Sequence, residues 1–119
     1  MPDFSEGFRL EKMRSGNAAI YILREQFEKF SSTLHKVDAC ESIASAFYQL
    51  EQFEDAAGWY ETAARLILSE PSATPAIKAL SALDDWEKAR DCYRRGDDDE
   101  KFTECSSLIR ELKRACASA

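Results

Sequence analysis

The chain has 119 residues, and its 22 Asp and Glu side chains outnumber 16 Lys and Arg, which gives a formal net charge of -6. This length fits one domain over residues 1–119, and a hydrophobic share of 45% indicates a packed core. Four glycines and three prolines are few for a fold with many tight turns, which disfavours an all-β architecture. The negative charge argues against nucleic-acid partners and against docking on an anionic membrane.

The start of the chain and the cysteines narrow the class of protein further. The first residues mix charges, and no run approaches ~18 apolar residues, so we expect neither a secretory signal nor membrane insertion. Cys40, Cys92, Cys105 and Cys116 form no Cys-x-x-Cys pair and have no histidine at metal-ligand spacing. We therefore expect reduced thiols that pack as small hydrophobic groups in a cytoplasmic protein, with no metal and no cofactor.

Apolar side chains recur at steps of three and four along most of the chain, which is the spacing of one helical face. The second of the expected helices, for example, has such a stripe from Ile20 to Leu34. No strand is predicted. The sequence predicts about seven helices, over residues 4–13, 17–34, 38–50, 53–67, 75–83, 86–96 and 101–119.

Capping residues mark several of the expected helix starts. Asn17 and Asp38 are predicted N-caps because their short polar side chains can accept a hydrogen bond from the first turn. The loop over residues 69–75 ends in Thr74 and Pro75, which suit the N-cap and the first helical position.

Other residues mark the expected helix ends. Asp84-Asp85 predicts an interruption between the fifth and sixth helices, and Gly96 predicts a C-terminal stop. The acidic run over residues 97–100 then places negative charge where a helix N-terminus favours it.

A shift of 33 residues aligns one part of the chain with another. A fixed period in this range is typical of stacked helix-turn-helix units. The aligned pairs are Phe47 with Leu80, Leu50 with Leu83, Phe53 with Trp86, Ala56 with Ala89, and Tyr60 with Tyr93.

The segment over residues 37–70 resembles a tetratricopeptide repeat. Small residues at Ala44, Ala56 and Ala63 match the places where the two helices of that repeat approach each other. Large residues at Phe47, Phe53 and Tyr60 match the places where aromatic side chains fill the gaps.

Residues 71–100 resemble a degenerate second unit. Trp86, Ala89 and Tyr93 match the pattern, whereas Ile77 and Gly96 replace small residues of the family. The resemblance implies an all-α solenoid of antiparallel helix-turn-helix repeats, with capping helices over residues 1–36 and 101–119. A generic antiparallel helical bundle is the alternative.

Enzyme signals are nearly absent from the sequence. The single histidine, His35, is expected at a helix end, and no serine or cysteine motif accompanies it. No phosphate-binding glycine loop is present, and residues 97–100 lack the alternating ligands of a calcium loop. We expect a protein that is not an enzyme.

The resemblance implies a polypeptide-binding groove lined by the first helix of each unit. Some family members hold a carboxylate there with paired cations and amides; this chain offers Lys78 as its one cation at those places, so we expect no such clamp. The expected groove residues are Glu41, Ser42, Ser45, Tyr48 and Gln49 in the first unit, and Thr74, Lys78, Ser81 and Ala82 in the second.

Negative charge concentrates in one segment of the chain. Residues 38–70 contain seven acidic side chains and a single basic one, Arg65, a local surplus equal to the net charge of -6. We expect such a face to attract a basic or amphipathic partner. Solubility alone is the alternative explanation.

The last helix has a stripe of apolar residues and is a second candidate surface. An exposed stripe could bind a partner or mediate self-association, whereas a covered one would cap the array. The stripe consists of Phe102, Cys105, Ile109, Leu112 and Cys116.

Together these features predict a protein-protein interaction module that acts as an adaptor or chaperone. Size, acidity and fold class also suit the tetratricopeptide-like secretion chaperones of bacterial type III systems. The alternative is a structural subunit that assembles through its terminal amphipathic helices.

Overall fold

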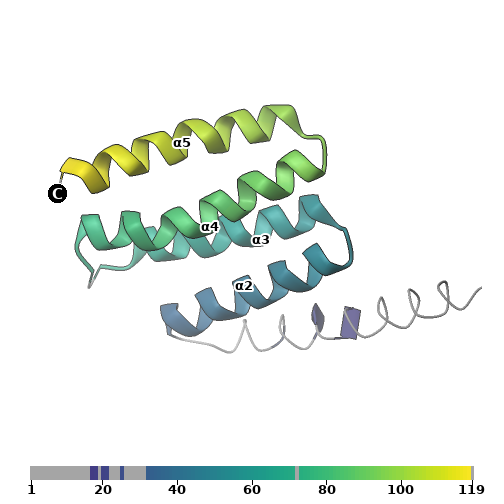
Figure 1. Ribbon diagram of the computed structural model, residues 1–119. Helices are drawn as coiled ribbons and strands as arrows, with labels where there is room; N and C mark the ends of the chain where they lie inside the picture. The colour runs from purple at the N-terminus through teal and green to yellow at the C-terminus, as the bar shows by residue number, and fades with distance from the viewer. Residues whose placement is uncertain (1–16, 19, 22–24, 26–31, 72, 119) are drawn as a thin grey trace, which may run out of the picture.

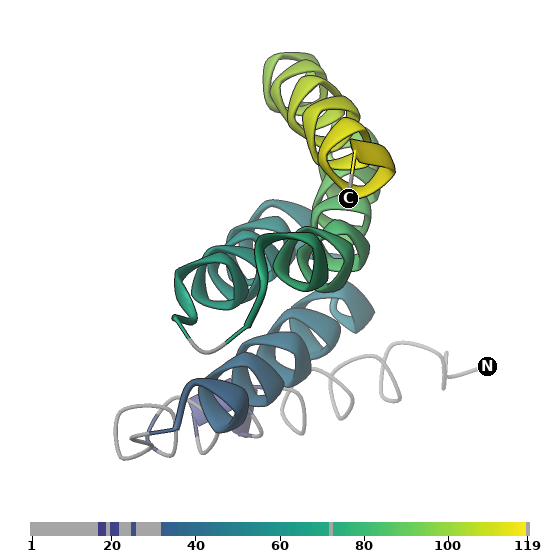
Figure 2. The ribbon, with the colours of Figure 1, turned by 90° about the vertical axis from the view of Figure 1, so that its left-hand side faces the viewer.

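Four antiparallel helices follow one another along the chain (Figure 1). The structure is a computed structural model that describes residues 17–18, 20–21, 25, 32–71 and 73–118. The helices are α2 (Thr33–Gln49), α3 (Phe53–Ser69), α4 (Pro75–Arg95) and α5 (Asp99–Ser118). Each of them packs against the next, and α3 and α4 lie between α2 and α5 (Figures 1 and 2).

The predicted all-α class is confirmed for the described residues, but seven helices is wrong. Those residues contain four full helices, and no repeating solenoid is evident in them. The helix expected over residues 4–13 lies outside the described part of the chain. Asn17 and Ile20 are helical, whereas Ser32 is not, so Leu34 belongs to α2 and not to the helix that contains Ile20.

Two predicted boundaries of α4 are confirmed. The Thr74 hydroxyl oxygen accepts a hydrogen bond from the Ile77 backbone N–H at 3.3 Å, and Pro75 occupies the first helical position. Gly96 is the C-cap of the same helix. Next to it, a carboxylate oxygen of Asp98 accepts a hydrogen bond from the Lys101 N–H at 3.1 Å, so the acidic run does open α5.

The predicted N-cap at Asp38 is wrong. Helix α2 begins five residues earlier, at Thr33, with Ser32 as an N-cap that makes no side-chain hydrogen bond. Asp38 therefore lies inside α2, and His35 lies in its first turn. The helix begins earlier because Val37 lies on its buried face, and packing of that face stabilises the first turns of the helix.

The predicted interruption at Asp84-Asp85 is also wrong. Helix α4 continues through these residues because Asp85 and Trp86 both lie on its buried face. The second expected unit is thus one helix and not a helix-turn-helix. The shift of 33 residues pairs Phe53, the first residue of α3, with Trp86 in the middle of α4, so the aligned positions are not structurally equivalent.

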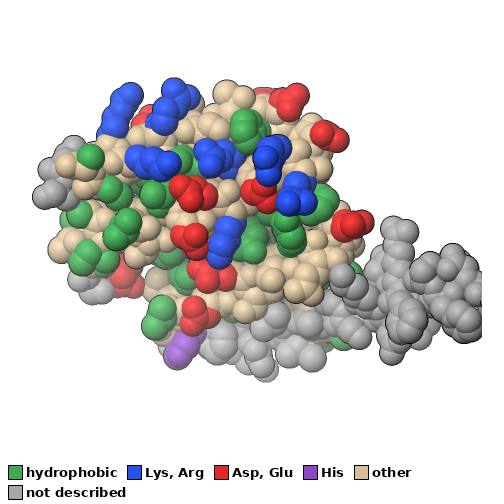
Figure 3. All heavy atoms as spheres, viewed as in Figure 1, with side chains coloured by type: hydrophobic (Ala, Val, Ile, Leu, Met, Phe, Trp, Pro, Cys, Tyr) green, Lys and Arg blue, Asp and Glu red, His purple; other side chains and the backbone are tan. Residues whose placement is uncertain are grey.

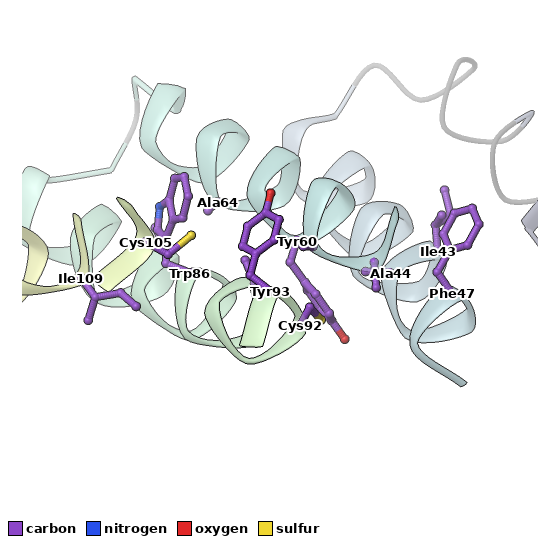
Figure 4. Packing of buried hydrophobic residues seen from close by; sticks show 14 of the residues in the cluster. Ile43, Ala44, Phe47, Tyr60, Ala64, Trp86, Cys92, Tyr93, Cys105 and Ile109 are labelled. Atoms are coloured by element: carbon purple, nitrogen blue, oxygen red, sulfur yellow. The ribbon is translucent and has the colours of Figure 1, made fainter. Parts of the chain in front are cut away.

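Small side chains occur where neighbouring helices approach each other. Alanines with no exposed surface allow this approach on α2, α3 and α4, and aromatic side chains fill the space around them (Figure 4). The fully buried alanines are Ala44, Ala56, Ala57, Ala63, Ala64, Ala82 and Ala89. The predicted distribution of small and large residues over 37–70 thus corresponds to the real hairpin of α2 and α3.

The cysteines are free thiols, as expected. Cys40, Cys92 and Cys105 are buried, and Cys116 is partly buried. Burial is the main cause that raises the pKa of Cys40 and of Cys92 to about 11, and that of Cys105 to about 12. These three thiols are therefore protonated and unreactive at neutral pH.

Candidate functional site

Helices α2 and α4 line two hollows on one face of the protein, with α3 contributing side chains beneath them. The first, here called the apolar hollow, has a volume of about 320 Å³. The second, here called the tyrosine hollow, has a volume of about 350 Å³. In the view of Figure 3, acidic and basic side chains follow the middle of this face, and hydrophobic side chains gather near the start of α4.

The apolar hollow lies where α2 begins, α3 ends and α4 begins. Leu34 and Ile77 are 68% and 57% exposed and stand beside the more deeply placed Val37 and Ile67. Exposed apolar side chains that line one hollow are candidate binding contacts. Carboxyl groups and one amino group are also among the lining residues, namely Asp38, Glu41, Glu70 and Lys78.

The tyrosine hollow is built from aromatic rings and charged side chains. Tyr48 packs edge-to-face on Phe53, with ring centroids 5.4 Å apart, and the Arg95 guanidinium lies 5.4 Å from the Tyr48 ring. The Lys88 amino group lies 5.7 Å from the Tyr60 ring and 3.2 Å from a carboxylate oxygen of Asp84. These contacts place a cation beside each of the two tyrosine rings that line this hollow.

Asp85 is buried on α4, in the stretch that contributes to both hollows. It is 1% exposed, and its Oδ1 atom has no hydrogen-bond partner among the residues that the structure describes. Burial first, and then the neighbouring Glu41 carboxylate, raise the pKa of Asp85 to about 8. Asp85 is therefore mostly protonated at neutral pH, and its side chain hydrogen-bonds that of Glu41.

The structure brings part of the predicted groove together. Glu41, Lys78 and Ser81 line the apolar hollow, and Tyr48 lines the tyrosine hollow. The other predicted residues are not among those that line either hollow: Ser45 is partly buried on α2, Ser42 and Gln49 are exposed there, Thr74 caps α4, and Ala82 is buried.

The stripe of α5 is mostly covered within the chain. Cys105, Ile109 and Leu112 are 2%, 2% and 9% exposed and belong to the core that includes α4 residues, while Phe102 and Cys116 are partly buried. The stripe therefore packs within the protein's own core. This packing leaves little of the stripe available for self-association.

The sequence analysis missed Asp85 and Leu34. Asp85 could have been found, because it follows Ala82 by three residues and precedes Ala89 by four, which places it on the buried face of a continuous helix. Leu34 was assigned to the preceding stripe, and no local signal separates the two helices except Ser32.

Other site chemistries find no support in the described part of the chain. No three His, Cys, Asp or Glu side chains are arranged there to hold a metal ion. None of the described helices combines the length and the apolar character needed to cross a membrane.

Comparison with known proteins adds no family to this description. No protein-family model matches the chain, and no curated protein and no solved structure shows significant similarity to it.

Proposed function

We propose that this protein is an interaction module that binds a segment of another polypeptide in the groove between α2 and α4. The exposed pair of Leu34 and Ile77 at the apolar hollow is the observation that supports this most directly. Hydrophobic anchors that enter such hollows dominate the binding energy of many peptide interfaces.

The rim of the apolar hollow favours a basic or amphipathic segment. Asp38, Glu41 and Glu70 contribute carboxyl groups there, against the single amino group of Lys78. Opposite charges on a partner would speed its association and orient it on the groove. An adaptor or a chaperone, including one of the type III secretion kind, is the role that we propose for such a module.

The test is affinity capture of partner proteins from the native host with the full-length chain, comparing wild type with Ile77→Gln. Ile77 is exposed, so the variant is expected to fold normally while it loses an anchor of the hollow. We expect the recovery of a defined partner to fall by about tenfold or more, which is typical of a lost anchor.

Leu80→Gln is the matched control. Leu80 lies on the same helix and is 64% exposed, but it is not among the residues that line the apolar hollow. The control is expected to keep the partner. Equal recovery with Ile77→Gln and Leu80→Gln would contradict binding in this groove.

The structural-subunit alternative is not favoured by the stripe of α5, because Ile109 and Leu112 are buried in the protein's own core. Sedimentation at several protein concentrations tests it directly. A dimer that Ile77→Gln dissociates would make the apolar hollow an assembly surface in place of a partner-binding one.

A further inference from the structure

The buried carboxyl group of Asp85 is only partly satisfied, because it hydrogen-bonds the Glu41 side chain while its Oδ1 atom has no partner in the described part of the chain. A polar atom buried without a hydrogen bond lowers stability, and most buried polar atoms in proteins have a partner. Oδ1 of Asp85 has no hydrogen-bond partner in the described part of the chain. The residues next to Asp85 on the same face of α4, Ala82 and Ala89, are apolar.

Charged and titratable groups from three helices face Asp85. Glu41 and Cys40 approach it from α2, Tyr60 from α3, and Asp84 and Lys88 from α4 itself. The Lys88 amino group is paired with Asp84 at 3.2 Å and lies over the Tyr60 ring, so this cation is only partly available to Asp85.

We propose that Glu41 and Asp85 together receive a cationic side chain, from Lys or Arg, of the polypeptide bound in the groove. The inference rests on the proposed function and adds the chemistry of one contact to it. Glu41 lines the apolar hollow and is partly exposed, so a cation that reaches Glu41 comes next to the carboxyl group behind it.

The position of the pair specifies the partner further. Glu41 shares the apolar hollow with Val37 and Ile77, so a cation at Glu41 lies beside a place for a hydrophobic side chain. A segment with a basic residue and a large apolar residue on the same face therefore satisfies both contacts.

Binding has a defined proton balance. In the free protein the Asp85 carboxyl holds a proton, which its Glu41 neighbour stabilises. When a cation arrives, the carboxyl ionises, the proton leaves to the buffer, and the positive side chain takes its place between the two carboxylates. A lysine or arginine keeps its own proton throughout.

Calorimetric titration of the full chain with synthetic peptides tests this inference. The probes are two amphipathic peptides of about 18 residues, one of Leu and Lys and one of Leu and Gln with the same pattern. Titrations at pH 7 in two buffers of different ionisation enthalpy measure the protons released. We expect the Leu/Lys peptide to release about one proton per molecule, because most Asp85 is protonated there.

Asp85→Asn keeps the size of the side chain and removes the titrating group. We expect this variant to bind the Leu/Lys peptide about tenfold more weakly or worse, with no proton released. Asp84→Asn is the matched control, because Asp84 is the adjacent residue and its side chain is 71% exposed. It should retain the proton release. Glu41→Gln provides a second variant on the facing helix and should lose it.

Proton release that is unchanged in Asp85→Asn would overturn the inference. So would equal binding of the two peptides by wild type. If both peptides bind equally and Ile77→Gln weakens both, the groove function survives while the cation site fails. If Ile77→Gln also leaves peptide binding and partner capture unchanged, the proposed function itself fails.

Discussion

Glu51 and Asp97 occupy equivalent positions in two helix-ending turns. Their φ angles are 60° and 59°, in the left-handed region, and each follows a C-cap, Leu50 or Gly96. The N–H of Glu51 donates a hydrogen bond to the Tyr48 carbonyl at 3.0 Å, and the N–H of Gln52 donates one to the Phe47 carbonyl at 3.0 Å. At the end of α4, the N–H groups of Asp97 and Asp98 make the corresponding bonds to the carbonyls of Arg94 and Tyr93. Two Schellman turns therefore join α2 to α3 and α4 to α5.

Glycine at either position should stabilise the protein. Glu51→Gly removes the cost of a left-handed residue with a side chain, and it removes a negative charge at the C-terminus of α2, so we expect a gain of about 1 kcal/mol. Asp97→Gly should stabilise the protein by a smaller amount, because Asp tolerates the left-handed conformation better than Glu does. Urea unfolding measures both. Glu51→Ala is the control, and a gain as large with alanine would contradict the conformational explanation.

Adjacent positions of α3 should respond in opposite ways to added side-chain atoms. A Cβ at exposed Gly58 would meet no atom within 4 Å, so Gly58→Ala should stabilise by about 1 kcal/mol through helix propensity. Ala57 has no exposed surface, so Ala57→Leu should destabilise by about 1–3 kcal/mol through overpacking. Denaturant unfolding of both variants tests the pair. A stable Ala57→Leu variant would mean that the interface of α3 is looser than described.

Stability should fall as pH rises because of Asp85. Its pKa is raised from 3.8 to about 8 on folding, so between these values the native state holds a proton that the unfolded state lacks. This contribution is complete below pH 3.8 and is lost by the time pH passes 8, and it amounts to on the order of 5 kcal/mol.

Asp85→Asn should remove that dependence, because asparagine does not titrate. Unfolding free energies at pH 5 and pH 9 for both proteins test the prediction. The unfolding free energy of the variant, relative to that of wild type, should increase as pH rises. Parallel pH profiles for the two proteins would show that Asp85 is ionised in the native state.

The N-cap of α4 should contribute more to stability than the N-cap of α2. Thr74 accepts a hydrogen bond from Ile77, so Thr74→Ala should cost about 1 kcal/mol of unfolding free energy. Ser32 makes no such bond at the start of α2, so Ser32→Ala should change stability by only a few tenths of that value. Thermal unfolding compares them, and equal losses would argue that Thr74 acts through something other than its hydroxyl.

Ile109 should contribute to folding and not to assembly. It is 2% exposed in the core formed with α4, so Ile109→Ala should destabilise by about 2–4 kcal/mol. Its neighbour Leu108 is only partly buried, and Leu108→Ala should cost less. Denaturation combined with sedimentation tests this. Unchanged stability together with a lost dimer would restore the assembly alternative.

Several features of the site and the fold follow from the sequence alone. Thr74-Pro75 and Gly96 locate the ends of α4 because caps act within one turn of backbone, and the small residues of 37–70 indicate a close hairpin. Of the predicted groove residues, Glu41 on α2 and Lys78 and Ser81 on α4 line one hollow, because both helices pack against α3.

The tertiary structure decided the rest. Asp84-Asp85 reads locally as a break, yet burial of Trp86 and Ala89 against neighbouring helices keeps α4 continuous, since packing outweighs the small cost of two aspartates in a helix. Because α4 is continuous, Asp85 is buried next to Glu41, which lies 44 positions earlier in the chain. The pKa of a carboxyl group depends on such neighbours, and how the helices pack decides which neighbours it has.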